Sequence, residues 1–250
     1  MRVTFAGVGE AFDENFANTS LLVESANTSL LIDCGFTAAS EFWKTSKHPL
    51  ELDGVYISHF HGDHYFGIPA LLVRFVQEGR TKPLKLIGQQ GIEARIDQLL
   101  TLAYPNSLSK AKFDIQFIES SPETKVALGD MHMEFAFGDH PMPCLAVKVE
   151  ANGKAVFHSS DGRPTEETRA LASGCQLIVH ESFTLETDSP GHGTVDSSIK
   201  FGQQAGADTV TLVHIRREVR RDKMPEIKSL CKNAGNINVL VPQPGDCVEI

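Results

Sequence analysis

Hydrophobic and polar residues alternate in three runs near the start of the chain, at residues 2–8, 20–24 and 29–33. Alternation with a period of two is the pattern of half-buried β-strands. The second and third runs flank the turn segment Ser25-Ala26-Asn27-Thr28, which predicts a β-hairpin. A polar loop at residues 10–16 lies between the first two runs and could overhang a site.

The rest of the chain alternates between short apolar runs and longer segments with apolar residues three or four positions apart. The first pattern predicts strands, and the second predicts helices packed on a sheet. Strands are expected at residues 55–58, 84–87, 112–118, 125–128, 131–137, 144–150, 154–158, 176–180, 209–214 and 237–241. Helices are expected at residues 66–77, 92–102, 165–172, 195–204 and 224–233. This order predicts an α/β (α+β) fold with two mixed sheets face to face and helices outside.

Composition limits the class of protein. The chain has 250 residues, of which 41% are hydrophobic, which is enough for one large domain over residues 1–250. No apolar run is long enough to cross a membrane and the first residues do not form a signal peptide, so we expect a cytoplasmic protein without a membrane partner. The net charge of −9 disfavours binding to nucleic acid. Five widely spaced cysteines without a Cys-x-x-Cys pair indicate reduced thiols.

A cluster of metal-ligand residue types follows the apolar run at residues 54–57. Alternate side chains of an extended segment share a face, so His59 and His61 can hold one ion together. Gly62 allows a turn that directs Asp63 and His64 to a second position. Imidazole and carboxylate groups suit zinc, and also iron or manganese. A His-x-His-x-Asp-His motif at a strand end is far more specific than a chance group of exposed histidines, so it predicts a metal site.

Three more residues of ligand type stand at the carboxyl ends of predicted strands, where open sheets gather their sites. They are His140, Asp161 and His214. Either histidine alone could be structural. Together with the first motif they complete two sites: one of His59, His61 and His140, the other of Asp63, His64 and His214, with Asp161 as the bridge. Two ions about 3.5–4 Å apart are a recurring device of hydrolytic enzymes.

With these residues the chain resembles the metallo-β-lactamase-fold hydrolases. All ligand positions of that family are filled, from His59 to His214. The resemblance implies a four-layer αββα sandwich and a centre of two divalent ions, with Zn²⁺ expected and Mn²⁺ or Fe²⁺ as alternatives. The diiron oxidoreductases with a similar motif have Glu where this chain has His61, which favours hydrolysis over redox chemistry.

Within that fold the closer resemblance is to ribonuclease Z and its phosphodiesterase relatives. The similar stretches are residues 58–69, Val179-His180-Glu181-Ser182-Phe183 and Gly191-His192-Gly193-Thr194. The resemblance implies that Glu181 and His192 form a catalytic pair, that His192 protonates the leaving oxygen and that Asp63 is also catalytic. Such a pair makes chemical sense because the pKa of an imidazole lies near working pH. Alternatively, Glu181 caps a strand and His192 is an exposed loop residue.

Two departures from that family argue against tRNA as the substrate. Ribonuclease Z carries a long Gly/Pro-rich arm between the ligands that match His140 and Asp161, and here a short hairpin fills that length. Its usual Asp-Thr pair is Asp161-Gly162 in this chain. The expected partner is therefore a small-molecule or short phosphodiester substrate.

Two other functions stay open. One is hydrolysis of carboxylic or sulfuric esters such as lactones, thioesters, β-lactams or aryl sulfates. The other is metal sensing without turnover. Proteins that resemble ribonuclease Z are often dimers, so a homodimer is also an open expectation.

Three features have two interpretations. Asp33 could brace the metal-binding loop by orienting a ligand histidine, or it could be a turn residue before Gly35. Cys144 could line the site, but we prefer a buried inert thiol. The basic residues between Arg216 and Lys223 could bind a phosphate, although we prefer a solvated helix face.

Overall fold

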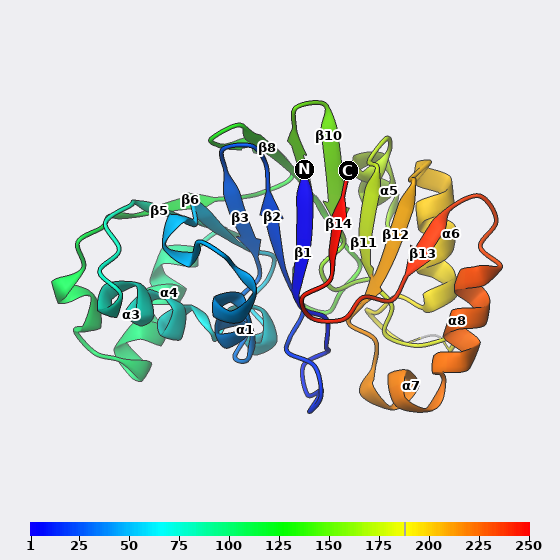
Figure 1. Cartoon of the computed structure of the whole chain (residues 1–250), viewed down its shortest axis with the longest axis horizontal. Helices are drawn as coiled ribbons and strands as arrows, with labels where there is room; N and C mark the ends of the chain where they lie inside the picture. The colour runs from blue at the N-terminus through cyan, green and yellow to red at the C-terminus, as the bar shows by residue number, and fades with distance from the viewer. Residues whose placement is uncertain (188) are drawn as a thin grey trace.

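Two seven-stranded sheets form the centre of the computed structural model, which describes residues 1–187 and 189–250 (Figure 1). The first sheet has the order β14-β1-β2-β3-β4-β5-β6 and the second has the order β13-β12-β11-β10-β9-β8-β7. The strands of the first sheet are β1 (Arg2–Gly7), β2 (Ser20–Glu24), β3 (Ser29–Ile32), β4 (Gly54–Ile57), β5 (Leu84–Gly88), β6 (Ile115–Glu119) and β14 (Cys247–Glu249). Those of the second are β7 (Val126–Leu128), β8 (Met131–Phe137), β9 (Leu145–Ala151), β10 (Lys154–His158), β11 (Leu177–Glu181), β12 (Thr209–Val213) and β13 (Asn238–Leu240).

Helices cover the outer face of each sheet. The helices on the first sheet are α1 (Ala38–Thr45), α3 (Ile68–Gln77) and α4 (Ile92–Ala103), and those on the second are α5 (Glu166–Ala172), α6 (Val195–Ala205) and α8 (Met224–Lys232). The remaining helical segments are short: α2 (Gly62–Tyr65), α7 (Arg217–Asp222), and the 3₁₀ turns η1 (Pro49–Glu51) and η2 (Ser107–Lys110). Among the described residues, no helix is both long and apolar enough to cross a membrane.

The inner faces of the two sheets bury a shared apolar core. It contains Phe5 and Leu21 from the first sheet and Met133 and Val147 from the second. Separate apolar clusters lie between each sheet and its helices. Burial of this surface is the main favourable contribution to folding. The four layers confirm the αββα sandwich that the family resemblance implies.

The strands that precede the predicted ligands end at the same edge of each sheet. β3 and β4 are parallel, as are β10, β11 and β12. β8 and β10 are both antiparallel to β9, so these two run in the same direction. Hydrogen bonds join the sheets near this edge: the Tyr56 hydroxyl donates to the Leu145 carbonyl at 2.8 Å, and the His214 N–H donates to the Val8 carbonyl at 3.0 Å. Residues far apart in the sequence therefore meet at this edge.

The elements differ from the sequence-based expectation in a few places. Both predicted hairpins form, as β2–β3 and β9–β10. The helix expected from residue 66 begins at Ile68, and the separate helix α2 precedes it. The break lies at Gly67, where a Cβ would come within 2.1 Å of the Gly35 carbonyl oxygen. Neither α1 nor β14 is predicted. The three residues of β14 include no buried side chain, so the strand has no apolar run that would identify it.

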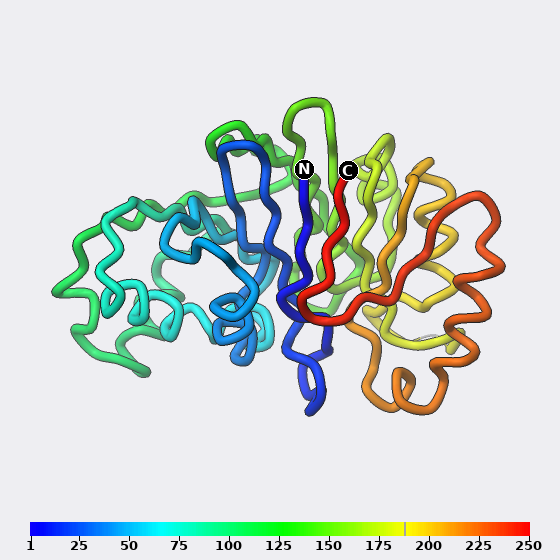
Figure 2. The backbone as a smooth tube through the Cα atoms, in the orientation of Figure 1, coloured from blue at the N-terminus to red at the C-terminus, as the bar shows by residue number. Residues whose placement is uncertain are grey.

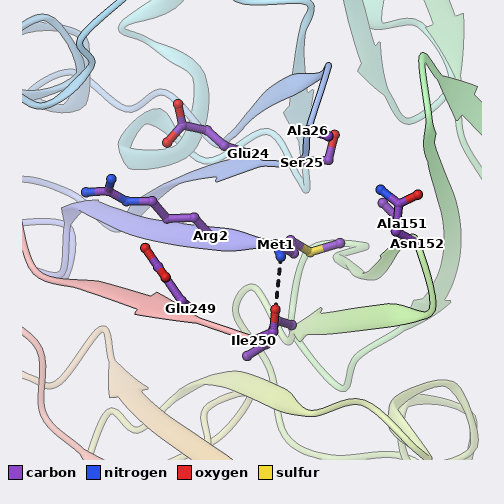
Figure 3. Close-up of a pocket in the computed structure, with 9 residues that line it drawn as sticks. All are labelled: Met1, Arg2, Glu24, Ser25, Ala26, Ala151, Asn152, Glu249 and Ile250. Atoms are coloured by element: carbon purple, nitrogen blue, oxygen red, sulfur yellow. Dashed lines mark hydrogen bonds between the residues drawn. The ribbon is translucent and has the colours of Figure 1, made fainter.

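A pocket of about 530 Å³ lies at the opposite edge of the sandwich (Figure 3). There the Met1 amino group donates a hydrogen bond to the Ile250 carbonyl at 2.9 Å. Figure 2 shows that both ends of the chain run side by side here, because β1 pairs with β14. No histidine or cysteine is among the residues that line this pocket. The ligand-type residues gather instead at the other edge.

Candidate metal centre

Three histidines and one aspartate meet where β4, β8 and β10 end. They are His59, His61, His140 and Asp161, with ligand atoms within 4.8 Å of one another. His59 and His61 project together because the segment between β4 and α2 is extended, with ψ of 147° at His61. The Nδ1 atom of His61 lies 3.0 Å from Nε2 of His59 and 3.3 Å from Nε2 of His140.

A second group of side chains shares the same aspartate. It contains Asp63, His64, Asp161 and His214, again with ligand atoms within 4.8 Å of one another. Oδ1 of Asp161 lies 3.4 Å from His64 Nε2 and 3.5 Å from His214 Nε2. Its other oxygen, Oδ2, lies 3.9 Å from His59 Nε2 in the first group. The structure thus brings together all seven residues that the sequence indicates, with Asp161 between the two groups.

In His140 and His64, a hydrogen bond at Nδ1 orients the ring so that its other nitrogen, Nε2, faces the two ligand groups. A carbonyl oxygen only accepts, so Nδ1 of His140 donates to Gly191 O at 2.8 Å and its Nε2 keeps a lone pair. Nδ1 of His64 lies 2.7 Å from Asp33 Oδ2, which leaves its Nε2 facing the second group. Among the described residues, this buried Nε2 has no hydrogen-bond partner. Such an atom is costly unless something satisfies it, and the imidazole and carboxylate donors around it fit a divalent metal ion.

Asp33 lies behind both groups rather than in an exposed turn. It is fully buried after β3, with φ of 59°. Its Oδ2 atom faces His64 and also accepts from the Ser58 hydroxyl at 2.8 Å, while Oδ1 accepts from the Ser58 N–H at 2.8 Å. This geometry favours the bracing interpretation, because a carboxylate that holds a ring N–H fixes the tautomer and orientation of the imidazole.

The second group pairs two carboxylates with two imidazoles that lie close enough to shift one another's pKa values. Burial alone would raise the pKa of Asp63, but the charge of His64 and a hydrogen bond from His214 hold it well below its usual range. The pKa of Asp161 is also low against the effect of burial, chiefly because of the charges of His214 and His64. Burial would lower the pKa of His214, but Asp161 and a hydrogen bond to Asp63 raise it to about 9. A cation bound here would therefore displace protons.

The first group differs in its electrostatics. Burial lowers the pKa of His59 well below its usual value, and the neighbouring charge of His64 adds to the effect. Burial and the neighbouring His140 also lower the pKa of His61. These two imidazoles are neutral near pH 7, which is the form that binds metal.

Glu181 and His192 lie in contact beside the two groups. Oε2 of Glu181 lies 3.1 Å from Nδ1 of His192, and Oε1 accepts from the N–H of Gly162 at 2.6 Å and from that of Gly193 at 3.1 Å. Glu181 is fully buried, whereas His192 is partly exposed. Burial would lower the pKa of His192, but the hydrogen bond to Glu181 and its charge raise it overall. The Glu181 carboxylate can only accept, so Nδ1 of His192 is the donor in this contact.

The open side of the site is formed by His61, His140 and His192, which are partly exposed, while the other ligand-type residues are buried. The ring of Phe183 stacks on that of His192 with centroids 4.4 Å apart and an interplanar angle of 25°. The sequence gives no signal for this contact, because Phe183 and His192 belong to separate stretches of a long loop.

The other ambiguous residues also have definite positions. Cys144 is fully buried, and burial raises the pKa of its thiol, which fits an inert group. Four of the five basic residues between Arg216 and Lys223 are paired with carboxylates: Arg216 with Glu218, Arg217 with Glu10, Arg221 with Asp222 and Lys223 with Glu226. The fifth, Arg220, is buried and donates a hydrogen bond to the Val8 carbonyl. The pair at Glu10 ties the loop at residues 10–16 to α7, and Gly9 bridges to Ile215 next to His214.

Comparison with known proteins supports the same fold. The profile of the family described as anti-Pycsar protein Apyc1 matches residues 1–231. The chain is 26% identical over 272 aligned residues to ribonuclease Z from Methanococcus maripaludis (strain C5), which covers 86% of each chain. Among solved structures, it resembles the metallo-β-lactamase-fold protein YhfI from Bacillus subtilis, with a TM-score of 0.82, 23% identity and 99% of each chain covered. It also resembles the short form of human tRNase Z, with a TM-score of 0.81, 18% identity, and 100% of this chain and 99% of that chain covered. The chain thus has the metallo-β-lactamase fold, and the resemblance to ribonuclease Z is confirmed.

Proposed function

This chain belongs to the family of the anti-Pycsar protein Apyc1, and from that premise and the geometry of the site we propose that it is a metal-dependent hydrolase of small or short phosphodiesters. The observation that carries the proposal is the Glu181–His192 pair, 3.1 Å apart, beside two ligand groups that share Asp161. A protein that only senses metal does not need a partly exposed histidine whose proton a buried carboxylate holds. A hydrolase does, because an alkoxide is a poor leaving group until it is protonated.

We propose two divalent ions, zinc in the first place, with Mn²⁺ or Fe²⁺ as alternatives. The first would be held by His59, His61 and His140, the second by Asp63, His64 and His214, and both by Asp161. Ions held in this way supply an activated water and polarise the phosphoryl group. Asp63 has a low pKa, so its carboxylate stays charged at any working pH and can bind the second ion.

The residues on the open side carry the rest of the reaction. Glu181 accepts from Nδ1 of His192, so the proton that leaves is the one on Nε2, on the side of the ring away from the carboxylate. As the phosphorus–oxygen bond breaks, that proton passes to the departing oxygen. The stacked ring of Phe183 limits rotation of His192, and His61 and His140 line the same open side. Fixing the proton donor before the reaction avoids the entropy cost of orienting it in the transition state.

The names ribonuclease Z and tRNase Z denote proteins that cleave RNA, a phosphodiester. Two features of this chain favour smaller substrates of that class. The segment between His140 and Asp161 contains only the β9–β10 hairpin, which leaves no length for an extended arm. The net charge of −9 repels a polyanion at long range.

The direct test is a substrate panel with the zinc-loaded full chain. It would compare a nitrophenyl phosphodiester and a dinucleotide with a set of lactones. We expect turnover of the phosphodiesters, and a higher kcat/KM on lactones would contradict the proposal. His192→Ala should lower kcat on the dinucleotide by about 10²–10⁴-fold while metal content stays unchanged. The matched control is His132→Ala, since His132 is an exposed histidine of β8 outside the site.

A further inference from the structure

Three buried side chains that hold no metal in the proposal above lie behind the ring of His59. They are Ser58, Cys144 and Ser160, all 2% exposed or less. The Ser58 hydroxyl lies 3.1 Å from His59 Nδ1, the Cys144 thiol 3.4 Å and the Ser160 hydroxyl 3.5 Å. Ser58 precedes the ligand His59 on the first sheet and Ser160 precedes the bridging Asp161 on the second, so their contact joins the two sheets.

The donors and acceptors of this cluster can be assigned so that every hydroxyl and the thiol donate one hydrogen bond. The Asp33 carboxylate only accepts, so the Ser58 hydroxyl donates to its Oδ2 at 2.8 Å. Ser58 then has lone pairs left to accept from the Ser160 hydroxyl at 2.5 Å and from the His59 ring. Ser160 in turn accepts from the Cys144 thiol at 3.2 Å. In this arrangement His59 carries its proton on Nδ1, and its Nε2 keeps a lone pair that faces His61 and Asp161.

The backbone at Ser160 supports a specific role for its hydroxyl. Ser160 has φ of 53°, in the left-handed region that glycine occupies with least strain. Residues held in this region are retained where the surroundings require them, often at functional sites. A glycine here would relieve the strain but lose the hydroxyl that donates to Ser58.

We propose that Ser160 is a positioning residue for the metal centre. Its hydroxyl completes the set of hydrogen bonds around Ser58, keeps His59 in the tautomer that offers Nε2 to the first ion, and fixes the Asp161 loop of one sheet to the His59 loop of the other. The inference rests on metal binding at the proposed site and is independent of the substrate. It also assigns Cys144 to the same set of hydrogen bonds, as the donor at its far end.

The test uses two substitutions that separate the hydroxyl from the backbone. Ser160→Ala removes the hydroxyl and keeps the strain, and Ser160→Gly removes both. We expect each to weaken Zn²⁺ binding at the first site by about 10–100-fold in competition with a chromophoric chelator, the range for residues that orient metal ligands. Zinc affinity of Ser160→Gly equal to that of the wild type would overturn the proposal. Asn152→Gly and Asn152→Ala are the matched controls, because Asn152 has φ of 55° in the exposed β9–β10 turn, and both should bind zinc normally.

A second measurement does not depend on the folding of any variant. In the zinc-loaded wild type, nitrogen-15 NMR of the histidine rings reports which nitrogen of His59 carries the proton. We expect a proton on Nδ1 and zinc on Nε2, and the reverse would overturn the proposal. Failure of the wild type to bind zinc at all would refute the metal centre itself, whereas normal binding with a wild-type-like Ser160→Gly would refute only the role of Ser160.

Discussion

Replacement of Glu181 by glutamine tests how the site holds the proton on His192. Oε1 of Glu181 accepts two backbone N–H groups, from Gly162 and Gly193, so the carbonyl oxygen of the new amide should take that place. The amide nitrogen would then face Nδ1 of His192 as a donor. Nδ1 would have to accept, and the protonated form of His192 would lose its charged partner.

The size of the effect follows from the type of bond that is lost. A hydrogen bond to a charged group contributes about 1.5–3 kcal/mol, which corresponds to a rate loss of about 10–150-fold if it acts fully on the proton donor. Glu181 raises the pKa of His192, so the variant should also lose its proton at lower pH. The alkaline limb of the rate profile should therefore move to lower pH.

The assay compares two phosphodiesters that differ only in the leaving group. A nitrophenolate departs as an anion, whereas an alkoxide needs a proton, so the loss in Glu181→Gln should appear with the alkyl ester and be small with the nitrophenyl ester. Metal content should equal that of the wild type. Equal losses on both substrates would refute the reasoning. Glu119→Gln is the control, because Glu119 also accepts a backbone N–H, from Gly91, but outside the cluster.

The remaining predictions concern metal binding, packing and stability. Zinc affinity should rise with pH up to about 9, because His214 has its pKa raised to about 9 and must lose its proton to bind metal. The rise should be roughly tenfold per pH unit for each proton released. A zinc affinity that chelator competition finds independent of pH would contradict this. Phe183→Leu should lower kcat about 2- to 12-fold at unchanged metal content, since an aromatic pair contributes about 0.5–1.5 kcal/mol, and loss of metal instead would show a different role. Burial lowers the pKa of His180 from 6.5 to about 4, so the unfolded chain binds a proton below pH 6.5 that the folded chain does not. As the pH falls from 6.5 to 4, the metal-free protein should therefore lose about 1.4 kcal/mol of stability per pH unit through this group. In His180→Leu, the free energy of unfolding measured with urea at pH 5 and 6 should depend less on pH.

The strand-end residues could be predicted because each follows an apolar run in the sequence. His140 and His214 stand directly after or near the end of a periodic segment, and parallel neighbours end at one edge. The support behind the metal site could not be predicted in this way. Ser58 and Ser160 belong to different sheets, and a serine before a ligand is common in any sequence. Their contact depends on the packing of two sheets, which local periodicity does not contain.

The same reason accounts for the parts of the fold that periodicity does not identify. β14 forms because β1 offers a free edge, and three residues with mostly exposed side chains carry no pattern of their own. The helix α2 is also short, with four residues, and its start at Gly62 depends on how the loop folds around the ligand cluster. Elements that contain an apolar run were predictable, whereas β14 and α2, which depend on a distant partner or on the ligand loop, were not.

The pairing of β1 with β14 links the completion of the first sheet to protein synthesis. Residues 2–4 leave the ribosome well before their partners, residues 247–249, have been synthesised. Until then this edge of the nascent sheet presents unpaired backbone groups to other chains. Contacts between such distant segments also slow folding. A growing chain can therefore already carry every ligand-type side chain and still have an open flank that chaperones need to shield.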